Sequence, residues 1–528
     1  MAEITPSETH PGGSQDHPPR HTSVSEKTVD LDPTPPKIDD APPDGGYGWV
    51  CVACNFFING HTWGVNSTYG VFLSYYLNNN YFPNTSALAY AFIGGLSISQ
   101  AVLIAPLATH VIHLYGTKVC LHLGIFFETL SLFGASFAKQ KYQIILAQGI
   151  CFGWGMGFLF VGSVGIIPQW FKKKRSVANS IAAAGSGLGG MMYSLATQRI
   201  IDTMGLPWAF RILGFCTLAV NLTAANLIRD RNKQTGARHK AMDTQILRRP
   251  EFLLVQGWSL FSMLGYTILL FSLPAYGRSI GLNAKESSLL GAILNLGQML
   301  GRPFIGLSSD RWGRLNLATF YTFLCGIFCF AFWIPAEVVS SPMGLLCFFA
   351  IVGGSLAGTF WTTIAPVAAE ILGLQDLPAG LSLTWLLMVP PTTFAEPIAL
   401  ELRRQTGHSW IYLPPQIFTA LTYFAAALCL WFARGWKVGE MQWEASKTQR
   451  DREQTMMMEE DRTRASETKT PLSEGTDSHP TVVDVPPAGP IIVDEWNRDV
   501  GNGGDIVTRR DIWRPRNMFR NMLVWQIV

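Results

Sequence analysis

The chain has 528 residues, of which 48% are hydrophobic and only 15% are charged. Its formal net charge of +3 is too small to indicate a nucleic-acid partner. The charged residues gather in the two ends of the chain and in a few short connections, which leaves long apolar segments between them. Because backbone in lipid must satisfy its own hydrogen bonds, these segments predict an all-α polytopic membrane protein.

In chain order, residues 1–43 are rich in Pro, Ser, Thr, His and Asp and predict a disordered cytoplasmic tail. A basic cytoplasmic linker, 229–250, separates an N-terminal half, 44–228, from a C-terminal half, 251–434. The apolar segments lie at about 50–77, 87–112, 117–138, 142–168, 176–200, 208–228, 251–276, 285–307, 315–336, 343–370, 378–400 and 411–434. About twelve helices in two six-helix halves are typical of a secondary transporter. Residues 435–528 predict a second, mostly disordered cytoplasmic tail.

The positively charged residues of the connections gather on one side of the predicted bundle. That side carries Lys118, the run Lys172–Arg175, the cluster at 229–249, Arg311 and Arg314. Lysine and arginine concentrate on the cytoplasmic side of membrane proteins, so both termini are expected inside the cell. We expect the surrounding bilayer to be the plasma membrane rather than the vacuolar membrane.

The nine cysteines lie almost entirely within apolar segments. No further ligands accompany the pair Cys51 and Cys54 or the pair Cys325 and Cys329, so we expect packing residues rather than a zinc site or disulfide. No nucleotide-binding loop of the type G-x-x-x-x-G-K-[ST] occurs, which argues against an ATP-driven pump. The sequence therefore predicts no metal and no cofactor.

Two stretches next to the apolar segments stand out. Small residues and one tryptophan open the first segment: Asp44, Gly45, Gly46, Tyr47, Gly48 and Trp49. Glycine lets the backbone turn there, and tryptophan favours the depth of the lipid headgroups. The second stretch, 170–186, includes Lys174, Arg175, Ala178 and Asn179. The glycines at 185–190 follow no strand, so they predict close helix packing rather than dinucleotide binding.

A third stretch, 306–314, ends the eighth apolar segment and begins the next connection. An acid at such a turn can pair with neighbouring arginines and with a helix N-terminus, which holds two helices in one state. We interpret five of its residues as a conformational lock: Gly306, Asp310, Arg311, Gly313 and Arg314.

The stretch 306–314 resembles the loop signature of the major facilitator superfamily, G-x-x-x-D-R-x-G-R, in its expected place within a half. In the equivalent stretch of the first half, only Gly116 and Lys118 remain. There His113 and Leu114 stand where the acid and the arginine are expected.

The stretches 43–49 and 170–186 are similar to two signatures of the monocarboxylate porter family, and the chain resembles its fungal members. The resemblance implies a major facilitator fold and a carrier whose two halves rock about a central site. It also implies a cargo of small organic acids or related solutes, often moved together with protons.

One narrow face of the first predicted helix is polar: Asn55, Asn59, Thr62, Asn66 and Tyr69. Polar groups facing lipid are costly, so we expect this face toward protein or a watery cavity. It serves either hydrogen bonds between helices or contact with cargo, and both interpretations stay open. His61 lies off this face, either as a packed histidine or as a proton site.

The eighth predicted helix has a polar face of the same kind: Ser288, Gly291, Asn295, Gln298, Arg302 and Gly306. Arg302 is the only cation deep in this helix, and its two-pronged donor suits a carboxylate, so we predict that it binds an anionic cargo. The alternative is that its side chain extends toward the cytoplasmic surface. The other predicted substrate-binding residues are Gln298, Asn295, Asn59, Asn66 and Ser67.

The resemblance also bears on proton coupling. Where characterised acid carriers of the family have an Asp in the eighth helix and a Lys in the first, this chain has Gln298 and Ser67. Neither of these side chains titrates in the useful range. A proton route would then need another group, and Glu396, which lies between Pro391 and Pro397, is the first candidate.

We expect a secondary active or facilitative transporter that works by alternating access and is not an enzyme. Its partners would be a small organic solute, monocarboxylate-like by resemblance, with or without a co-transported proton, and the lipid bilayer. Two alternatives stay open: a non-transporting nutrient receptor, and a carrier of a neutral solute such as riboflavin or of a secondary metabolite. The sequence leaves protein partners unknown.

Overall fold

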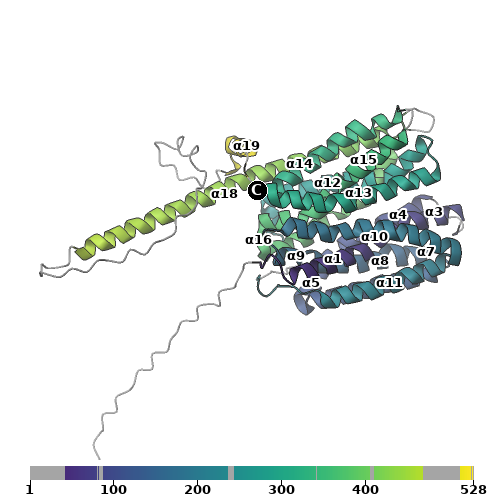
Figure 1. Ribbon diagram of the computed structural model, residues 1–528, viewed down its shortest axis with the longest axis horizontal. Coiled ribbons are helices and arrows are strands. Elements are labelled where there is room, and N and C mark those ends of the chain that lie inside the picture. Colours follow the sequence, from purple (N-terminus) through teal and green to yellow (C-terminus); the bar gives the residue numbers. More distant parts are fainter. Residues whose placement is uncertain are drawn as a thin grey trace, which may run out of the picture. The chain divides into compact units, whose positions relative to one another are not determined.

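A computed structural model describes most of the chain: residues 42–79, 81–82, 87–235, 243–339, 342–404, 410–467, 512–524, 526 and 528. Within these ranges the ordered elements are helices, and no strand occurs (Figure 1). Eight of the helices are long and apolar enough to cross a membrane by length and composition. One of them, 342–402, is divided into two helices by a kink at Gly373, whose φ of 78° and ψ of 170° are not helical. The predicted tail 1–43 lies outside the described residues except for its last two positions.

The first membrane helix of the N-terminal half consists of three pieces, α1 (Gly48–His61), α2 (Trp63–Ser67) and α3 (Tyr69–Asn78). Breaks fall at Thr62 and Thr68. The hydroxyl of Thr62 donates to the carbonyl oxygen of Ile58 at 2.7 Å, a bond that competes with the helix backbone and bends it.

The remaining helices of this half follow with short connections. They are α4 (Ala87–Leu103), α5 (Ala105–Tyr115), α6 (Thr117–Ser136), α7 (Lys141–Ile144), the π-helix η1 (Ile145–Cys151), α8 (Phe152–Val164), α9 (Ile167–Trp170), α10 (Arg175–Met204) and α11 (Leu206–Leu227). Breaks divide the second and fourth membrane helices into several pieces. Together with the first membrane helix, these elements therefore form six membrane helices.

The C-terminal half repeats the scheme. Its elements are η2 (Ile246–Arg248), α12 (Pro250–Ser279), α13 (Ala284–Trp312), α14 (Arg314–Phe328), η3 (Cys329–Trp333), η4 (Pro335–Glu337), α15 (Pro342–Ala357), α16 (Thr359–Leu387), α17 (Val389–Leu402) and α18 (Leu413–Glu467). A last helix, α19 (Pro515–Leu523), packs against α18. In the predicted second tail, residues 435–467 continue α18. Residues 512–524 include α19, which contacts α18, and 468–511 lie outside the described residues.

The halves meet where α10 runs along α13, and glycines let the helices approach closely. A Cβ added at Gly187 would lie 2.9 Å from the Asn295 carbonyl oxygen of α13. One added at Gly189 would lie 2.1 Å from the Gly60 carbonyl oxygen of α1. The prediction that the glycines at 185–190 serve close packing is therefore confirmed.

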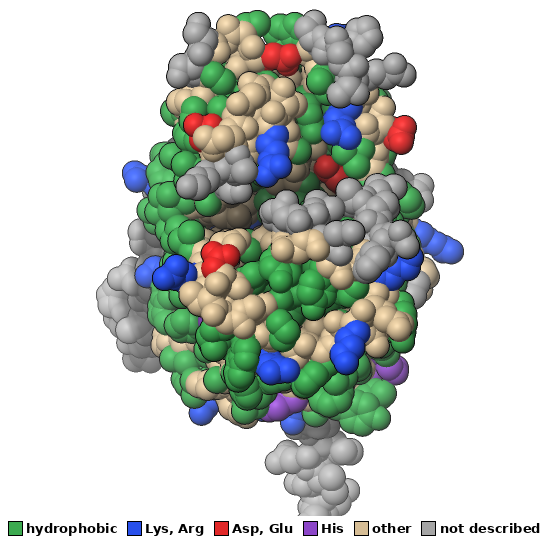
Figure 2. Space-filling view, turned by 90° about the vertical axis from the view of Figure 1, so that its right-hand side faces the viewer, with side chains coloured by type: hydrophobic (Ala, Val, Ile, Leu, Met, Phe, Trp, Pro, Cys, Tyr) green, Lys and Arg blue, Asp and Glu red, His purple; other side chains and the backbone are tan. Residues whose placement is uncertain are grey.

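We call the end of the bundle that holds Gly116, Lys172–Lys174, Gly313 and Gly373 the basic end; it lies on the left in Figure 1. Figure 2 shows the opposite end, where hydrophobic side chains cover much of the surface and charged ones are scattered. The surface in that view is hollowed between the two halves.

Candidate functional site

The helix α13 ends at Trp312. It is followed by Gly313, whose φ of 98° few other residues adopt, and α14 begins at the next residue. Asp310 lies in the last turn of α13. Its two carboxylate oxygens accept hydrogen bonds from the backbone amides of Ser176 at 3.0 Å and Val177 at 2.8 Å, in the first turn of α10. First-turn amides have no partner within their own helix and carry partial positive charge. Asp310 thus caps a helix of the other half.

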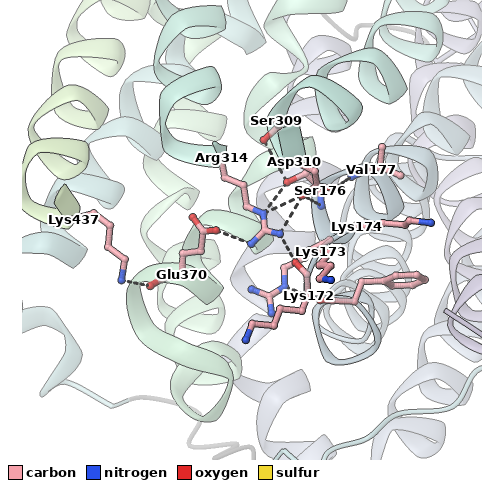
Figure 3. A network of polar contacts seen from close by, with 12 residues as sticks. Lys172, Lys173, Lys174, Ser176, Val177, Ser309, Asp310, Arg314, Glu370 and Lys437 are labelled. Carbon is pink, nitrogen blue, oxygen red and sulfur yellow. Dashed lines mark hydrogen bonds and ion pairs between the residues drawn. The ribbon is translucent and has the colours of Figure 1, made fainter. Parts of the chain in front are cut away.

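Arg314 extends this contact into a network (Figure 3). Its guanidinium forms ion pairs with Asp310 at 3.1 Å and with Glu370 of α16 at 2.6 Å. It also donates to the backbone carbonyl oxygen of Lys172 in the connection before α10. Lys437 of α18 donates to the backbone oxygen of Glu370 at 3.0 Å. We call these residues, with Ser176 and Val177, the Asp310 network.

The predicted pairing of Asp310 with both arginines holds only for Arg314. Arg311 is exposed, and its guanidinium lies over the ring of Trp312, 5.8 Å from the ring centre. The cause is helix geometry, because a residue four positions on shares the face of Asp310 and the next residue does not. Gly306, one turn earlier, is where α13 touches α10: a Cβ there would lie 2.3 Å from the Ser180 hydroxyl oxygen.

Asp44 supports the same connection from the other side. Its carboxylate accepts hydrogen bonds from the backbone amides of Lys172 and Lys173, each at 2.6 Å. Burial raises the pKa of the Asp44 carboxyl, but the amides of Lys172, Lys173 and Lys174 together lower it below its ordinary value. The two predicted signature stretches therefore touch each other. Their contact lies directly before the N-terminus of α10, which Asp310 caps.

The other signature residues pack around this connection. Gly46 has a φ of 61°, and a Cβ on Gly48 would lie 2.9 Å from the Phe171 ring. Trp49 stands edge-on to that ring, with 5.0 Å between ring centres. Gly45 begins the turn that leads into α1, because its carbonyl oxygen accepts from the Gly48 amide.

Four signature residues lie at the start of α10. Lys174 is the residue before the helix, and Ala178 is fully buried. Arg175 is buried, and its Nε donates to the Phe171 carbonyl oxygen at 3.0 Å. Asn179 reaches the other half, where its side-chain amide donates to the Thr362 carbonyl oxygen at 2.6 Å.

Arg302 lies at the centre of the interface between the halves and is only 3% exposed. Its Nη1 donates to the Ala183 carbonyl oxygen of α10 at 2.6 Å and to the hydroxyl of Ser186, and its Nη2 donates to Gln298. Its side chain therefore does not extend toward the surface. The Nε–H donates to no acceptor in the part of the chain that the structure describes.

Gln298 joins Arg302 to a second element. It is 2% exposed, and its side-chain oxygen also accepts from the Tyr266 hydroxyl of α12 at 3.0 Å. Gly358, at the break between α15 and α16, leaves room for the guanidinium, since a Cβ there would lie 3.0 Å from the Arg302 Nε. The break in the tenth membrane helix thus accommodates the arginine.

The predicted binding residues of the first membrane helix divide between two neighbours. Asn59 donates to the Ala182 carbonyl oxygen of α10 at 3.2 Å, whereas Asn66 accepts from the Ser97 hydroxyl of α4 at 2.7 Å. Ser67 and Asn295 come from different halves and both lie near Gly190: a Cβ there would be 3.1 Å from the Ser67 Cβ and 3.6 Å from the Asn295 Cγ. The structure brings Asn59, Ser67, Asn295 and Arg302 to α10, with Gln298 bonded to Arg302 and Asn66 bonded to α4 instead.

Aromatic rings from both halves pack beside this centre. Trp63 and Phe160 of the N-terminal half meet Trp361 with ring centres 4.9 and 5.9 Å apart. Phe160 also meets Trp385 at 5.0 Å, and Tyr266 meets Trp361 at 6.2 Å. We call these five residues the aromatic plug. Sequence reasoning missed the plug, because its members are scattered over five membrane helices and share no local pattern.

The two predicted proton sites lie apart from Arg302. Glu396 of α17 is partly buried and accepts from the Ser272 hydroxyl of α12 at 3.2 and 3.3 Å to its two oxygens. His61 contacts the Phe57 carbonyl oxygen of its own helix at 2.9 Å and stands edge-on to Tyr193. These contacts favour a packed histidine. The intramembrane acid Glu128 accepts from Asn221 at 2.7 Å, and Glu370 belongs to the Asp310 network.

With this geometry in place, known proteins offer a comparison. The sequence matches the Major Facilitator Superfamily over residues 49–388. The probable transporter MCH2 of Saccharomyces cerevisiae is 36% identical over 400 residues, which cover 74% of this chain and 83% of MCH2. The fujikurins efflux protein of Gibberella fujikuroi is 28% identical over 399 residues, which cover 74% of this chain and 82% of that protein.

Solved structures resemble the fold at low sequence identity. The proton:xylose symporter XylE aligns with a TM-score of 0.56 and 14% identity, over 73% of this chain and 94% of XylE. The Escherichia coli fucose:proton symporter FucP aligns with a TM-score of 0.55 and 14% identity, over 73% of this chain and 98% of FucP. These alignments confirm the predicted all-α fold of about twelve membrane helices in two six-helix halves.

Proposed function

Because the chain belongs to the major facilitator superfamily and is a transporter rather than an enzyme, we propose that it carries a small organic anion of the monocarboxylate type. In this proposal Arg302 binds the negative group of the cargo, and the two halves alternate their access to it. The observation that carries the proposal is the guanidinium of Arg302, buried between the halves with its Nε–H unpartnered among the described residues.

The partners of Arg302 suggest how the cargo binds. In the present state the guanidinium donates to Ala183 and Ser186 of the opposite half. A carboxylate accepts two parallel hydrogen bonds from one guanidinium, so an anion would replace these weaker neutral acceptors. Ser67 and Asn295, which lie near each other at Gly190, would contact the rest of the solute.

The contacts between the halves support alternating access. The Asp310 network and the bond from Asn179 to Thr362 join the halves at the basic end, and the Arg302 contacts join them at the centre. The aromatic plug lies beside the centre. From these contacts we infer a carrier that is closed at the basic end. The two halves must separate there to release cargo on that side.

We infer that the basic end faces the cytoplasm, because its connections hold the excess of lysine and arginine. Both termini would then be cytoplasmic, and the membrane would be the plasma membrane. Tags at either terminus that protease reaches from outside intact cells would contradict this orientation.

Proton coupling would use Glu396. This carboxyl lies in the helix that follows the break at Met388, and its described hydrogen-bond donor is the hydroxyl of Ser272. No arginine or lysine pairs with it within hydrogen-bond distance in the described residues, so protonation would break no ion pair. Gln298 and Ser67 cannot take up a proton in the useful range, which leaves Glu396 as the first candidate.

One observation favours a neutral solute as the second candidate. Both terminal nitrogens of Arg302 already donate to neutral groups, Nη1 to Ala183 and Ser186 and Nη2 to Gln298, as in a purely structural arginine. In that case the carrier would take a neutral solute such as a vitamin or a secondary metabolite. The fujikurins efflux protein, similar in sequence, is named for the export of fujikurins.

The test is uptake into cells or vesicles, with and without a pH gradient, of solutes chosen by comparing metabolites in deletion and overexpression cells. Removal of a buried, hydrogen-bonded charge costs ~2 kcal/mol or more, so Arg302→Ala should reduce anion uptake at least about 30-fold. Arg302→Lys should cause a smaller loss, since it keeps the charge but not the fork. Arg199→Ala, on the exposed face of α10, is the matched control.

Glu396→Gln should abolish the response to the pH gradient and leave downhill transport in place. Wild-type accumulation that survives both Arg302→Ala and Glu396→Gln, at equal surface levels, would refute both residue assignments. Binding without any accumulation by the wild type would instead identify a nutrient receptor.

A further inference from the structure

The helix α18 continues beyond the membrane helices, and a segment from the far end of the chain lies against it. We call residues 512–528 the tail segment; of these, 512–524, 526 and 528 are described. The tail segment lies against α18 from Trp431 to Gly439 and against the first turn of α14. We call this surface the tail groove.

The groove binds the tail segment through its main chain. Arg434 donates from Nη1 to the Met522 carbonyl oxygen at 2.9 Å and from Nη2 to the Val524 carbonyl oxygen at 2.6 Å. The indole of Trp431 also donates to Met522 at 3.1 Å. Arg434 is buried, and a buried guanidinium needs acceptors for its protons. The tail segment supplies two of them.

A second set of bonds joins the tail segment to the first turn of α14. The amide of Leu315 donates to the Val528 carbonyl oxygen at 3.0 Å, and the side chain of Asn316 donates to the Gln526 carbonyl oxygen at 2.8 Å. The Leu315 amide is a first-turn donor without a partner in its own helix, so the tail segment caps α14. This cap adjoins Gly313 and Arg314 of the turn that carries the Asp310 network.

Glycines in α18 make room for the tail segment. A Cβ on Gly435 would lie 2.6 Å from the Met522 Cγ, and one on Gly439 would lie 2.6 Å from the Asn521 Nδ2 and 2.7 Å from Ile512. Glycine within a helix costs about 1 kcal/mol relative to alanine. Met518, Asn521 and Met522, on one face of α19, are buried, as is Ile512. The two positions of α18 that face the tail segment thus hold glycine, although glycine destabilises a helix.

We propose that the tail groove is a binding site for the chain's own tail segment and that the bound segment holds the basic end closed. It does so by capping α14 beside Gly313, which positions Arg314 for its pairs with Asp310 and Glu370. Binding of the segment stands independently of the cargo, whereas its effect on closure rests on the proposed role of the Asp310 network.

The test of binding is limited proteolysis of the purified full-length protein with trypsin, which cuts after Arg516 and Arg520. Gly439→Leu extends into the groove, where the three atoms nearest an added Cβ all belong to Asn521 and Ile512 of the tail segment, and Thr455→Leu changes an exposed position farther along α18 as a control. Cleavage tracks the fraction of segment that is released, so Gly439→Leu should speed it at least about 10-fold, and Thr455→Leu should not. Equal cleavage in the wild type and Gly439→Leu would refute the binding site.

The test of closure uses spin labels at Lys118→Cys and Gln375→Cys, which lie exposed at the basic end in different halves. The exposed Cys216 is removed as Cys216→Ser. Gly439→Leu and deletion of 512–528 should both raise the ratio of long to short label distances, by about 5-fold or more. Released segment with unchanged distances would refute the effect on closure. An effect of Gly439→Leu that deletion fails to reproduce would refute it as well, because the substitution would then act through α18 alone.

Discussion

The turn between α5 and α6 and the turn between α13 and α14 occupy equivalent places in the two halves. Gly116 has a φ of 87° and Gly313 a φ of 98°, and in each case the next helix begins at the following residue. Backbone geometry is thus nearly the same in both. The side chains differ: Asp310 and Arg314 cross to the other half, whereas His113 and Leu114 are exposed.

Two of the contacts between the halves differ accordingly. The helix α13 meets α10 through charged groups, backbone amides and an arginine, each directional. Near α5 the contact with α16 is apolar: Val102 and Ala105, at the join of α4 and α5, and Phe160 of α8 share one buried cluster with Trp385. Charged hydrogen bonds hold one geometry, while apolar packing tolerates small shifts. We infer that one contact fixes the closed state and the other permits the movement.

The largest effect is expected where the polar contact is broken. Asp310→Asn removes the charge that caps α10 and pairs with Arg314. A coupling of ~1–3 kcal/mol would shift the ratio of open to closed basic end by about 5- to 150-fold. Label distances between Lys118→Cys and Gln375→Cys measure this ratio without any knowledge of the cargo.

The equivalent position of the first half provides the control for that experiment. His113→Asn changes an exposed side chain that makes no described contact with the other half, so it should leave the distances unchanged. Equal shifts for Asp310→Asn and His113→Asn would show that the two turns act alike.

The second prediction concerns what the turns share. Alanine at Gly116 or Gly313 must adopt a backbone region that is essentially confined to glycine, at a cost of about 1–3 kcal/mol each. Both variants should therefore melt at lower temperature. Gly313→Ala should lose more, since its Cβ would also lie 2.5 Å from the Val528 carbonyl oxygen, whereas Gly116 has open space.

Thermal unfolding of the two purified variants, read by loss of monodisperse protein, measures this difference. Deletion of 512–528 removes the clash with Val528 and should bring the two glycine variants closer in stability, while the Asn316 side chain, 2.9 Å from a Cβ at Gly313, must still shift. A Gly116→Ala variant as stable as the wild type would mean that its turn is not required.

Much of this contrast could be predicted from the sequence, since the acid and arginines appear in one turn and not in the other. The choice of Arg314 over Arg311 also follows from helical spacing, although the pattern G-x-x-x-D-R-x-G-R by itself allows Asp310 to pair with either arginine. What could not be predicted is the partner of Asp310, because Ser176 lies 134 residues away along the chain. The same holds for Asp44 and its partner Lys172, 128 residues away.

At the centre, the polar face of the eighth membrane helix correctly singled out Arg302 and Gln298 as neighbours. Its contacts with Ala183 and Ser186 depend on how α10 packs against α13, which no local pattern reveals. The aromatic plug escaped prediction for the same reason. Helical periodicity identifies which residues face inward but not which of them meet.

The smallest effect is expected for the apolar contact. This effect also tests whether the apolar contact and the polar contact hold the carrier closed independently of each other. Phe160→Leu keeps an apolar side chain of similar size but removes the ring that meets Trp63, Trp361 and Trp385. Aromatic pairs contribute ~0.5–1.5 kcal/mol beyond their buried area, so the open fraction should rise only about 2- to 10-fold. Because no hydrogen bond of the Asp310 network involves Phe160, the combined variant with Asp310→Asn should show the product of the two single shifts in the label distances. A combined shift no larger than that of Asp310→Asn alone would mean that the plug opens only after the network breaks, so that the polar contact governs both.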